Sequence, residues 1–129
     1  MQTIAIRLRR GDDLKHSITK LVEKHNITAG VVLSAVGCLT QVSIRLAGAK
    51  AQLNKMGEFE ILSLSGTLSQ GGVHLHLAIA NTLGEAFGGH LLKGNIIDTT
   101  CELVIGVLAG TEFLREQDET TGFKELVVN

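Results

Sequence analysis

Three of the five histidines in this 129-residue chain fall within one short segment. His74 and His76 lie two positions apart, and His90 follows fourteen residues after His76, directly behind Gly88 and Gly89. In a β-strand, residues i and i+2 point to the same face, and their Cα atoms lie roughly 6.5–7 Å apart. Two such imidazoles can close around one ion, and neutral imidazole nitrogen is a ligand of zinc and related divalent metals. The segment therefore suggests a metal site with zinc as the first candidate.

The same spacing has a second interpretation. His74 and His76 could form the solvated face of an edge strand whose Leu75 and Leu77 face the core. The two glycines before His90 are expected to let the backbone bend sharply, which would bring this ring close to the others. Taken from the residues alone, both alternatives stand.

Acid–base chemistry beside a metal needs a carboxylate, and the nearby candidates are Glu85, Asp98 and Glu60. Each could serve as a general base toward a metal-activated water, and the alternative for Glu85 and Asp98 is a solvated surface carboxylate. The strand around Glu60 is otherwise apolar, which predicts that this carboxylate is buried and paired. None of the serines lies in a G-x-S-x-G nucleophile elbow. No catalytic residue is assigned from the sequence.

Composition bounds the class of protein. A length of 129 residues predicts one domain, residues 1–129, with a core of its own. The formal net charge is −1 and the one basic cluster is Arg7, Arg9 and Arg10, which argues against broad phosphate neutralisation. No apolar run reaches the length of a membrane span, and the N-terminal residues do not form a secretion signal, so a cytoplasmic location is expected. Cys38 and Cys101 sit in apolar surroundings and are expected to be buried, reduced thiols.

Hydrophobic periodicity predicts one helix among many strands. The helix is expected to open at Gly11–Asp13 and to stop at Asn26, with an apolar stripe formed by Leu14, Ile18, Leu21 and Val22. Strands are expected at residues 4–8, 30–39, 41–46, 58–68, 73–80, 99–108 and 111–115. The connecting segments are a hairpin loop at 47–56, a turn at 70–72, a glycine-rich link at 81–90 and a mobile tail or added edge strand within 116–129. This order predicts an α+β fold with a mainly antiparallel sheet.

Several motifs, in order, resemble the plant-and-prokaryote-conserved (PPC) domain. They are Arg7-Leu8 with Gly11-Asp12-Asp13-Leu14, Thr28-Ala29-Gly30, Gly37-Cys38-Leu39, the run from Phe59 to Thr67, His74-Leu75-His76, and the run from Gly88 to Gly94. The similarity extends from the first strand to about Gly106. It implies an α+β fold with an antiparallel sheet that assembles as a homotrimer. It also implies a metal held by histidines, which would be His74, His76 and His90 here.

The family is also labelled as DNA-binding, because its plant members carry AT-hook motifs. An AT-hook needs Arg-Gly-Arg-Pro, but this chain has no proline, and Asp12 breaks the pattern that Arg10-Gly11 begins. Two functions therefore remain open. One is a trimeric interaction or regulatory module with a histidine metal site. The other is a metal-dependent enzyme or small-molecule-binding protein that uses the same histidines.

Overall fold

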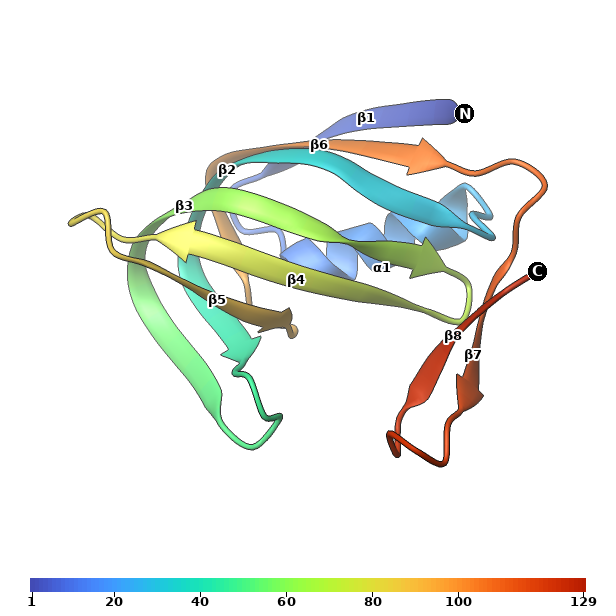
Figure 1. Ribbon diagram of the computed structural model, residues 1–129. Coiled ribbons are helices and arrows are strands. Elements are labelled where there is room, and N and C mark those ends of the chain that lie inside the picture. The colour runs from blue at the N-terminus through green and yellow to red at the C-terminus, as the bar shows by residue number, and fades with distance from the viewer.

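A six-stranded antiparallel sheet with a single helix on one face forms the body of the chain (Figure 1). The computed structural model describes all residues, 1–129. Its elements are β1 (Gln2–Arg9), α1 (Leu14–Lys24), β2 (Gly30–Arg45), β3 (Gln52–Ser69), β4 (Gly72–Ala80), β5 (Ala86–Leu91), β6 (Ile96–Val107), β7 (Phe113–Gln117) and β8 (Lys124–Val128). The strand order in the sheet is β1-β6-β2-β3-β4-β5. The predicted α+β class is confirmed. No helix is both long and apolar enough to span a membrane.

Helix α1 forms as its sequence predicts. The carboxylate of Asp13 caps its start by accepting a hydrogen bond from the backbone N–H of His16 at 3.0 Å. Lys24 lies in the last turn, where a positive charge favours the negative end of the helix dipole. The expected apolar stripe is buried against the sheet and consists of Leu14, Ile18, Leu21 and Val22. This packing fixes which face of the sheet is left for the histidines.

The sheet curls until strands that are distant in its order meet. Strand β2 pairs with β6 and β3 along its length, and its end also pairs with β5. In that last pairing Ile44 lies opposite Leu91, and Arg45 lies opposite His90. Strands β2, β3, β4 and β5 therefore close on one another at one end of the molecule.

Two sequence-based boundaries in this region are wrong. Residues 30–39 and 41–46 were expected to be two antiparallel strands, but they form the single strand β2. The register shifts between Leu39 and Gln41, so the polar residues there mark a β-bulge and not a turn. Strand β3 begins at Gln52, so the expected loop at 47–56 is shortened to the residues between β2 and β3.

The remaining differences lie after β4. The glycine-rich segment 81–90, expected to be a link, contains most of strand β5. In the C-terminal segment β8 pairs with β7 in a separate two-stranded sheet and adds no edge to the main one. Phe113 anchors this hairpin, because its side chain is buried and its backbone N–H donates to the carbonyl of Thr28. The mobility expected of residues 116–129 stays a prediction.

Both cysteines are free thiols, as expected. Cys101 is fully buried, and this burial raises the pKa of its thiol to about 11. Cys38 is only partly buried, which departs from the expectation. The Cys101 thiol stays protonated near neutral pH and behaves as a small apolar side chain.

Candidate metal centre

Strand β4 carries two of the three histidines on the face turned away from the core. Leu75 and Leu77 are each only 2% exposed and pack into the core beneath α1, whereas His74 and His76 are exposed. Because side chains alternate along a strand, burial of the leucines orients both histidines outward. Strand β4 lies between β3 and β5, so the expected edge position is wrong, whereas the exposure of both histidines agrees with the solvated face of the second interpretation.

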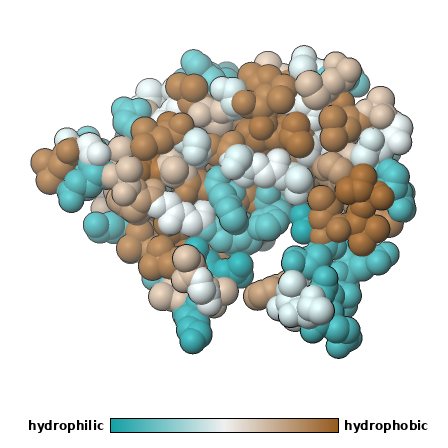
Figure 2. Space-filling model, in the orientation of Figure 1, coloured by the Kyte–Doolittle hydropathy of each residue, from teal (hydrophilic) through white to brown (hydrophobic).

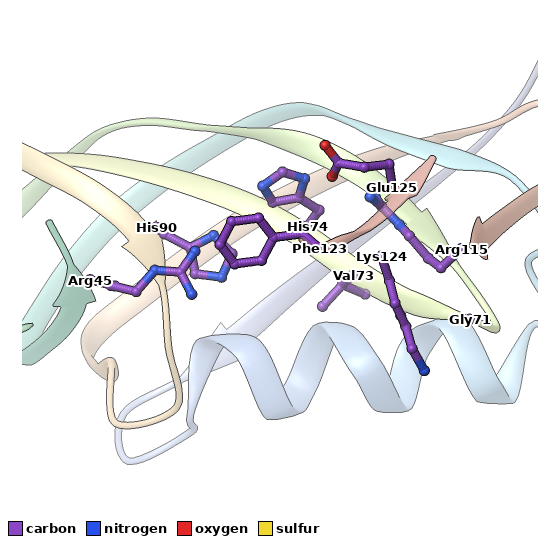
Figure 3. A pocket seen from close by; sticks show the side chains of 10 residues that line it. Arg45, Gly71, Val73, His74, His90, Arg115, Phe123, Lys124 and Glu125 are labelled. Carbon is purple, nitrogen blue, oxygen red and sulfur yellow. The ribbon is translucent and has the colours of Figure 1, made fainter. Parts of the chain in front are cut away.

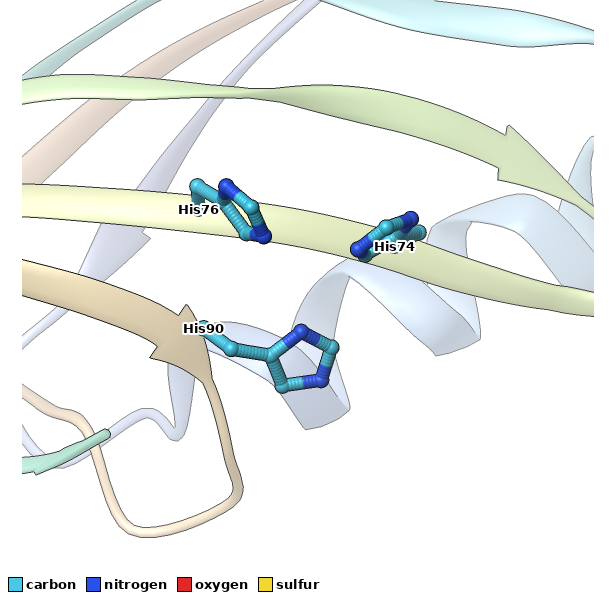
Figure 4. Close-up of side chains that lie close together, drawn as sticks. All are labelled: His74, His76 and His90. Atoms are coloured by element: carbon cyan, nitrogen blue, oxygen red, sulfur yellow. The ribbon is translucent and has the colours of Figure 1, made fainter. Parts of the chain in front are cut away.

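The third histidine arrives from the neighbouring strand. His90 of β5 lies directly opposite His76 of β4 in the antiparallel register. The ring centroids are 5.1 Å apart for His74 and His76, 5.2 Å for His74 and His90, and 5.8 Å for His76 and His90. Figure 4 shows the rings of His74 and His76 along β4, with the ring of His90 reaching toward them from β5. One ring nitrogen from each histidine lies within 4.8 Å of the others.

Glycine is needed before His90 for a reason other than the expected bend. Gly88 and Gly89 lie inside strand β5. A Cβ atom at Gly88 would collide with the backbone carbonyl oxygen of Leu77, and one at Gly89 would meet that of Arg45. The two glycines therefore permit the close approach of β4 and β2 to β5. This closure positions His90 beside His76.

The donor set fits a metal ion such as zinc. Nδ1 of His90 is buried and has no hydrogen-bond partner, which is unusual for a buried polar atom. Desolvation, and then the nearby positive charge of Arg45, lower the pKa of His90 to about 4. Desolvation, and then the neighbouring His76, also lower the pKa of His74. Both rings are therefore neutral at pH 7, which is the form that binds a metal.

Ligation would require a modest contraction of the cluster. In a tetrahedral zinc site with bonds of about 2.0–2.1 Å, ligand nitrogens lie about 3.3–3.4 Å apart. The present separations extend to 4.8 Å. His74 and His76 are exposed, so rotation about their side-chain torsions would be the simplest way to shorten these separations.

The pKa of His90 predicts how the metal-free protein responds to acid. An unfolded histidine has a pKa of about 6.5, whereas His90 in the folded chain has a pKa of about 4. Between these values the unfolded chain binds a proton that the folded chain does not. The contribution of His90 to the free energy of unfolding is therefore greatest above pH 6.5 and declines as the pH falls toward 4. Urea unfolding of the wild type and His90→Gln at pH 7, 5.5 and 4.5 measures this, and the variant should lose less stability. An equal decline in both proteins would contradict the assignment.

A cavity opens beside the histidines. It has a volume of about 370 Å³, and its lining includes His74 and His90 from the sheet with Arg115, Phe123 and Glu125 from the C-terminal hairpin (Figure 3). Figure 2 shows the surface hollowed between this hairpin and the tip that joins β2 to β3, with hydrophilic atoms on its floor. The cluster is thus accessible to small molecules.

The three expected base candidates lie away from the histidines. Asp98 pairs with Arg10 at 3.2 Å, and Glu85 accepts a hydrogen bond from the side-chain amide of Asn81 at 3.1 Å. Glu60 is exposed, so the prediction of a buried, paired carboxylate is wrong. None of the three lines the cavity beside His74 and His90.

The charged residues that do lie there were missed by the sequence reasoning. They are Arg45, Arg115, Lys124 and Glu125. Arg45 lies at the end of a strand whose polar and apolar residues alternate regularly, so the sequence could have predicted the face of the sheet on which it lies. The sequence could not have predicted which residues surround it. The other three residues reach the cavity because the C-terminal hairpin packs beside the sheet, and no local sequence pattern predicts this packing.

Comparison with known proteins places the chain among a set of related structures. It is 41% identical over 126 residues to the bifunctional protein GlmU of Synechococcus sp. strain JA-3-3Ab, a match that covers 98% of this chain and 20% of GlmU. The chain thus spans about a fifth of the length of that relative. It resembles a hypothetical protein from Salmonella with a TM-score of 0.96 and 36% identity over 99% of this chain and 93% of that one.

Another similar structure is that of a protein that contains a metal. The metal-containing protein from Archaeoglobus fulgidus shares 30% identity and a TM-score of 0.80, covering 98% of this chain and 94% of that one. A protein from Bacteroides thetaiotaomicron that is provisionally described as DNA-binding has a TM-score of 0.87 over 97% of this chain and 91% of that one. Its identity is 18%, so this likeness shows the fold alone.

The sequence profile of one family matches residues 1–109, which include all of β1 to β6 and the three histidines. This agrees with the motifs and with the observed fold. The chain belongs to the Plants and Prokaryotes Conserved (PCC) domain family.

Proposed function

We propose that this chain is a metal-dependent small-molecule-binding domain in which His74, His76 and His90 hold one divalent ion, with zinc as the first candidate. The observation that carries the proposal is the convergence of three imidazoles from β4 and β5 beside an accessible cavity. The buried, unpartnered Nδ1 of His90 supports it, because a metal would satisfy this atom. The metal-containing relative from Archaeoglobus fulgidus adds further support.

The site has the composition of catalytic metal centres, which is why the enzyme alternative stays open. Catalytic zinc sites use three protein ligands and leave one position for water or substrate. A metal bound there would supply Lewis acidity toward a ligand oxygen. In the chain itself, Glu125 is the carboxylate that lines the cavity and could accept a proton, while Arg45 and Arg115 could orient a bound molecule.

Metal content tests the proposal. Protein purified without a histidine tag should take up about one equivalent of zinc per chain in a calorimetric titration at pH 7. The lowered pKa values of His74 and His90 favour this uptake, because both rings are already deprotonated. Elemental analysis of the purified protein identifies the metal that it retains. Uptake below about 0.2 equivalents, both as purified and after titration, would contradict the proposal.

We further propose that the chain assembles as a homotrimer. Large apolar side chains on the sheet remain uncovered in the single chain, with Leu33 47%, Val36 59% and Leu62 55% exposed. Figure 2 shows apolar residues gathered across the upper part of the molecule, over the sheet. Contiguous apolar surface of this kind marks interfaces between proteins.

Light scattering at micromolar concentration should give three times the mass of one chain. Leu62→Lys should shift the protein toward smaller species, because a charge at a buried interface is costly. The exposed Leu83→Lys, on the turn between β4 and β5, is the control and should leave the mass unchanged. A monomeric wild type would contradict the trimer.

The DNA-binding label has little support from charge. The formal net charge is −1, and in the one basic cluster Arg10 forms an ion pair with Asp98, which leaves only Arg7 and Arg9 there as unpaired cations. Non-specific DNA affinity depends on free lysines and arginines. A regulatory role on DNA is thus the second candidate, supported by the family's label alone. A cytoplasmic location stays a prediction.

A further inference from the structure

We propose that the cavity beside the histidines binds a small organic carboxylate, with Arg45 and Arg115 as the groups that recognise it. This inference rests on the proposed metal site, because it places the anion where a second oxygen of the same ligand can reach the ion. The cavity volume of about 370 Å³ lies at the lower end of the range for ligand pockets. It suits a molecule of a few carbon atoms.

Each arginine lies beside one histidine of the cluster. Arg45 pairs with His90 in the register between β2 and β5. Arg115 donates a hydrogen bond through Nη2 to Oγ1 of Thr67 at 3.0 Å, and Thr67 lies opposite His74 in the register between β3 and β4. Figure 3 shows the two guanidinium groups toward opposite ends of the cavity. A ligand between them would contact both.

Neither guanidinium is neutralised within the chain. The two ion pairs join Arg10 to Asp98 and Lys20 to Glu23. Both Arg45 and Arg115 are half-buried, so their charges are partly desolvated and yet lack a carboxylate partner. A guanidinium presents parallel N–H donors that match the two oxygens of a carboxylate. These two side chains are therefore available to an external anion.

The charge of the whole lining favours an anion. Three cationic side chains, Arg45, Arg115 and Lys124, line the cavity with one carboxylate, Glu125. The charged side chains of the lining thus sum to a formal charge of +2, whereas the chain as a whole carries −1. Clefts lined by one sign of charge concentrate ligands of the opposite sign. A divalent ion on the histidines would strengthen the effect.

The C-terminal hairpin supplies the part of the cavity wall that would select the ligand. Arg115, Phe123 and Lys124 all lie beyond residue 109, where the match to the family profile ends. Phe123 is 54% exposed and offers an apolar surface for the carbon atoms of a ligand. The metal cluster belongs to the matched region, whereas recognition of the anion depends largely on the C-terminal hairpin.

The test compares lactate with its neutral amide, lactamide, and with inorganic phosphate. Each is titrated into metal-free and zinc-loaded protein while the Nε–Hε signals of the arginines are followed by NMR. Lactate should shift the signals of Arg45 and Arg115 in both forms and bind more tightly to the zinc-loaded form, while lactamide should bind at least about tenfold more weakly. Equal binding of lactamide, or tighter binding of phosphate than of lactate, would overturn the proposal.

Variants assign the contacts. Arg45→Gln and Arg115→Gln should each weaken lactate binding about tenfold or more and leave zinc affinity within threefold of the wild type. Arg115→Lys keeps the positive charge but loses the two parallel N–H donors of the guanidinium. It should therefore weaken lactate binding even where the folded hairpin is preserved. Lys50→Gln, an exposed cation between β2 and β3, is the control and should change nothing. Unchanged lactate affinity in all arginine variants would overturn the assignment.

The two proposals can fail separately. Zinc binding without any lactate binding would overturn the carboxylate site alone. Lactate binding to the metal-free protein without zinc uptake would overturn the metal site, and would leave the two arginines as an anion site that functions without it.

Discussion

His76→Ala should weaken zinc binding by at least about 100-fold. Loss of an outer-shell partner already costs 10–100-fold in metal affinity, and His76 is proposed to bind the ion directly. The ring lies opposite His90 and within reach of His74, so its removal leaves two imidazoles in the cluster. Competition against a chelator of known zinc affinity, at pH 7, measures the change.

The same variant should leave the fold intact. His76 is exposed on the outer face of β4, and replacing an exposed strand residue changes stability by less than about 1 kcal/mol. His16→Ala is the matched control, because His16 is an exposed histidine on α1 outside the cluster. It should bind zinc as the wild type does. An unfolded His76→Ala would show that the ring has a structural role, and unchanged zinc affinity would show that the ion binds elsewhere.

Asn95→Leu should lower the free energy of unfolding by about 2–5 kcal/mol. The Asn95 side chain is fully buried. Its Oδ1 accepts from the backbone N–H of Ser43 at 2.9 Å, and its Nδ2 donates to the carbonyls of Ser43 and Leu92 at 2.8 and 2.7 Å. A leucine fills similar space but leaves the Ser43 N–H and the Leu92 carbonyl without these partners. Each unpaired buried group costs about 1–3 kcal/mol.

Urea unfolding of the metal-free protein measures this loss. Asn54→Leu is the control, since Asn54 accepts a hydrogen bond from the hydroxyl of the same Ser43 but is exposed. It should cost less than about 1 kcal/mol. A similar loss in both variants would mean that the Asn95 bonds do not hold the loop after β5. Because that loop directly follows the His90 strand, Asn95→Leu should also weaken zinc binding.

The sequence predicts best where one local pattern determines the structure. The apolar stripe of α1 and its Asp13 cap lie in one continuous segment, so both could be read directly. The alternation of β4 likewise predicted that His74 and His76 share a face. In each case the burial of close neighbours in the chain decides the orientation.

Prediction failed where distant backbone contacts override a local preference. Glycine is depleted in strands, so Gly88 and Gly89 indicated a flexible link, yet they lie in β5 because two other strands approach too closely for a Cβ atom. The apolar pattern likewise predicts two strands on either side of Thr40, whereas the structure has one strand with a bulge there. Neither the close approach of the strands to Gly88 and Gly89 nor the bulge can be read from the local sequence.

The candidate site divides in the same way. The three histidines lie within seventeen residues of one another in the chain, and their spacing identified them. The arginines of the cavity come from β2 and β7, and they meet the histidines only through closure of the sheet and docking of the hairpin. The histidine cluster could therefore be predicted from the sequence. The cavity wall that would select a ligand could not.

The most direct test of the metal site is a crystal structure of the zinc-loaded protein with diffraction data collected on both sides of the zinc absorption edge. We expect one anomalous peak per chain, at about 2.0–2.1 Å from one nitrogen of each of His74, His76 and His90 of the same chain. A peak bound by other residues, a peak shared between histidines of different subunits, or no peak at the cluster would contradict it.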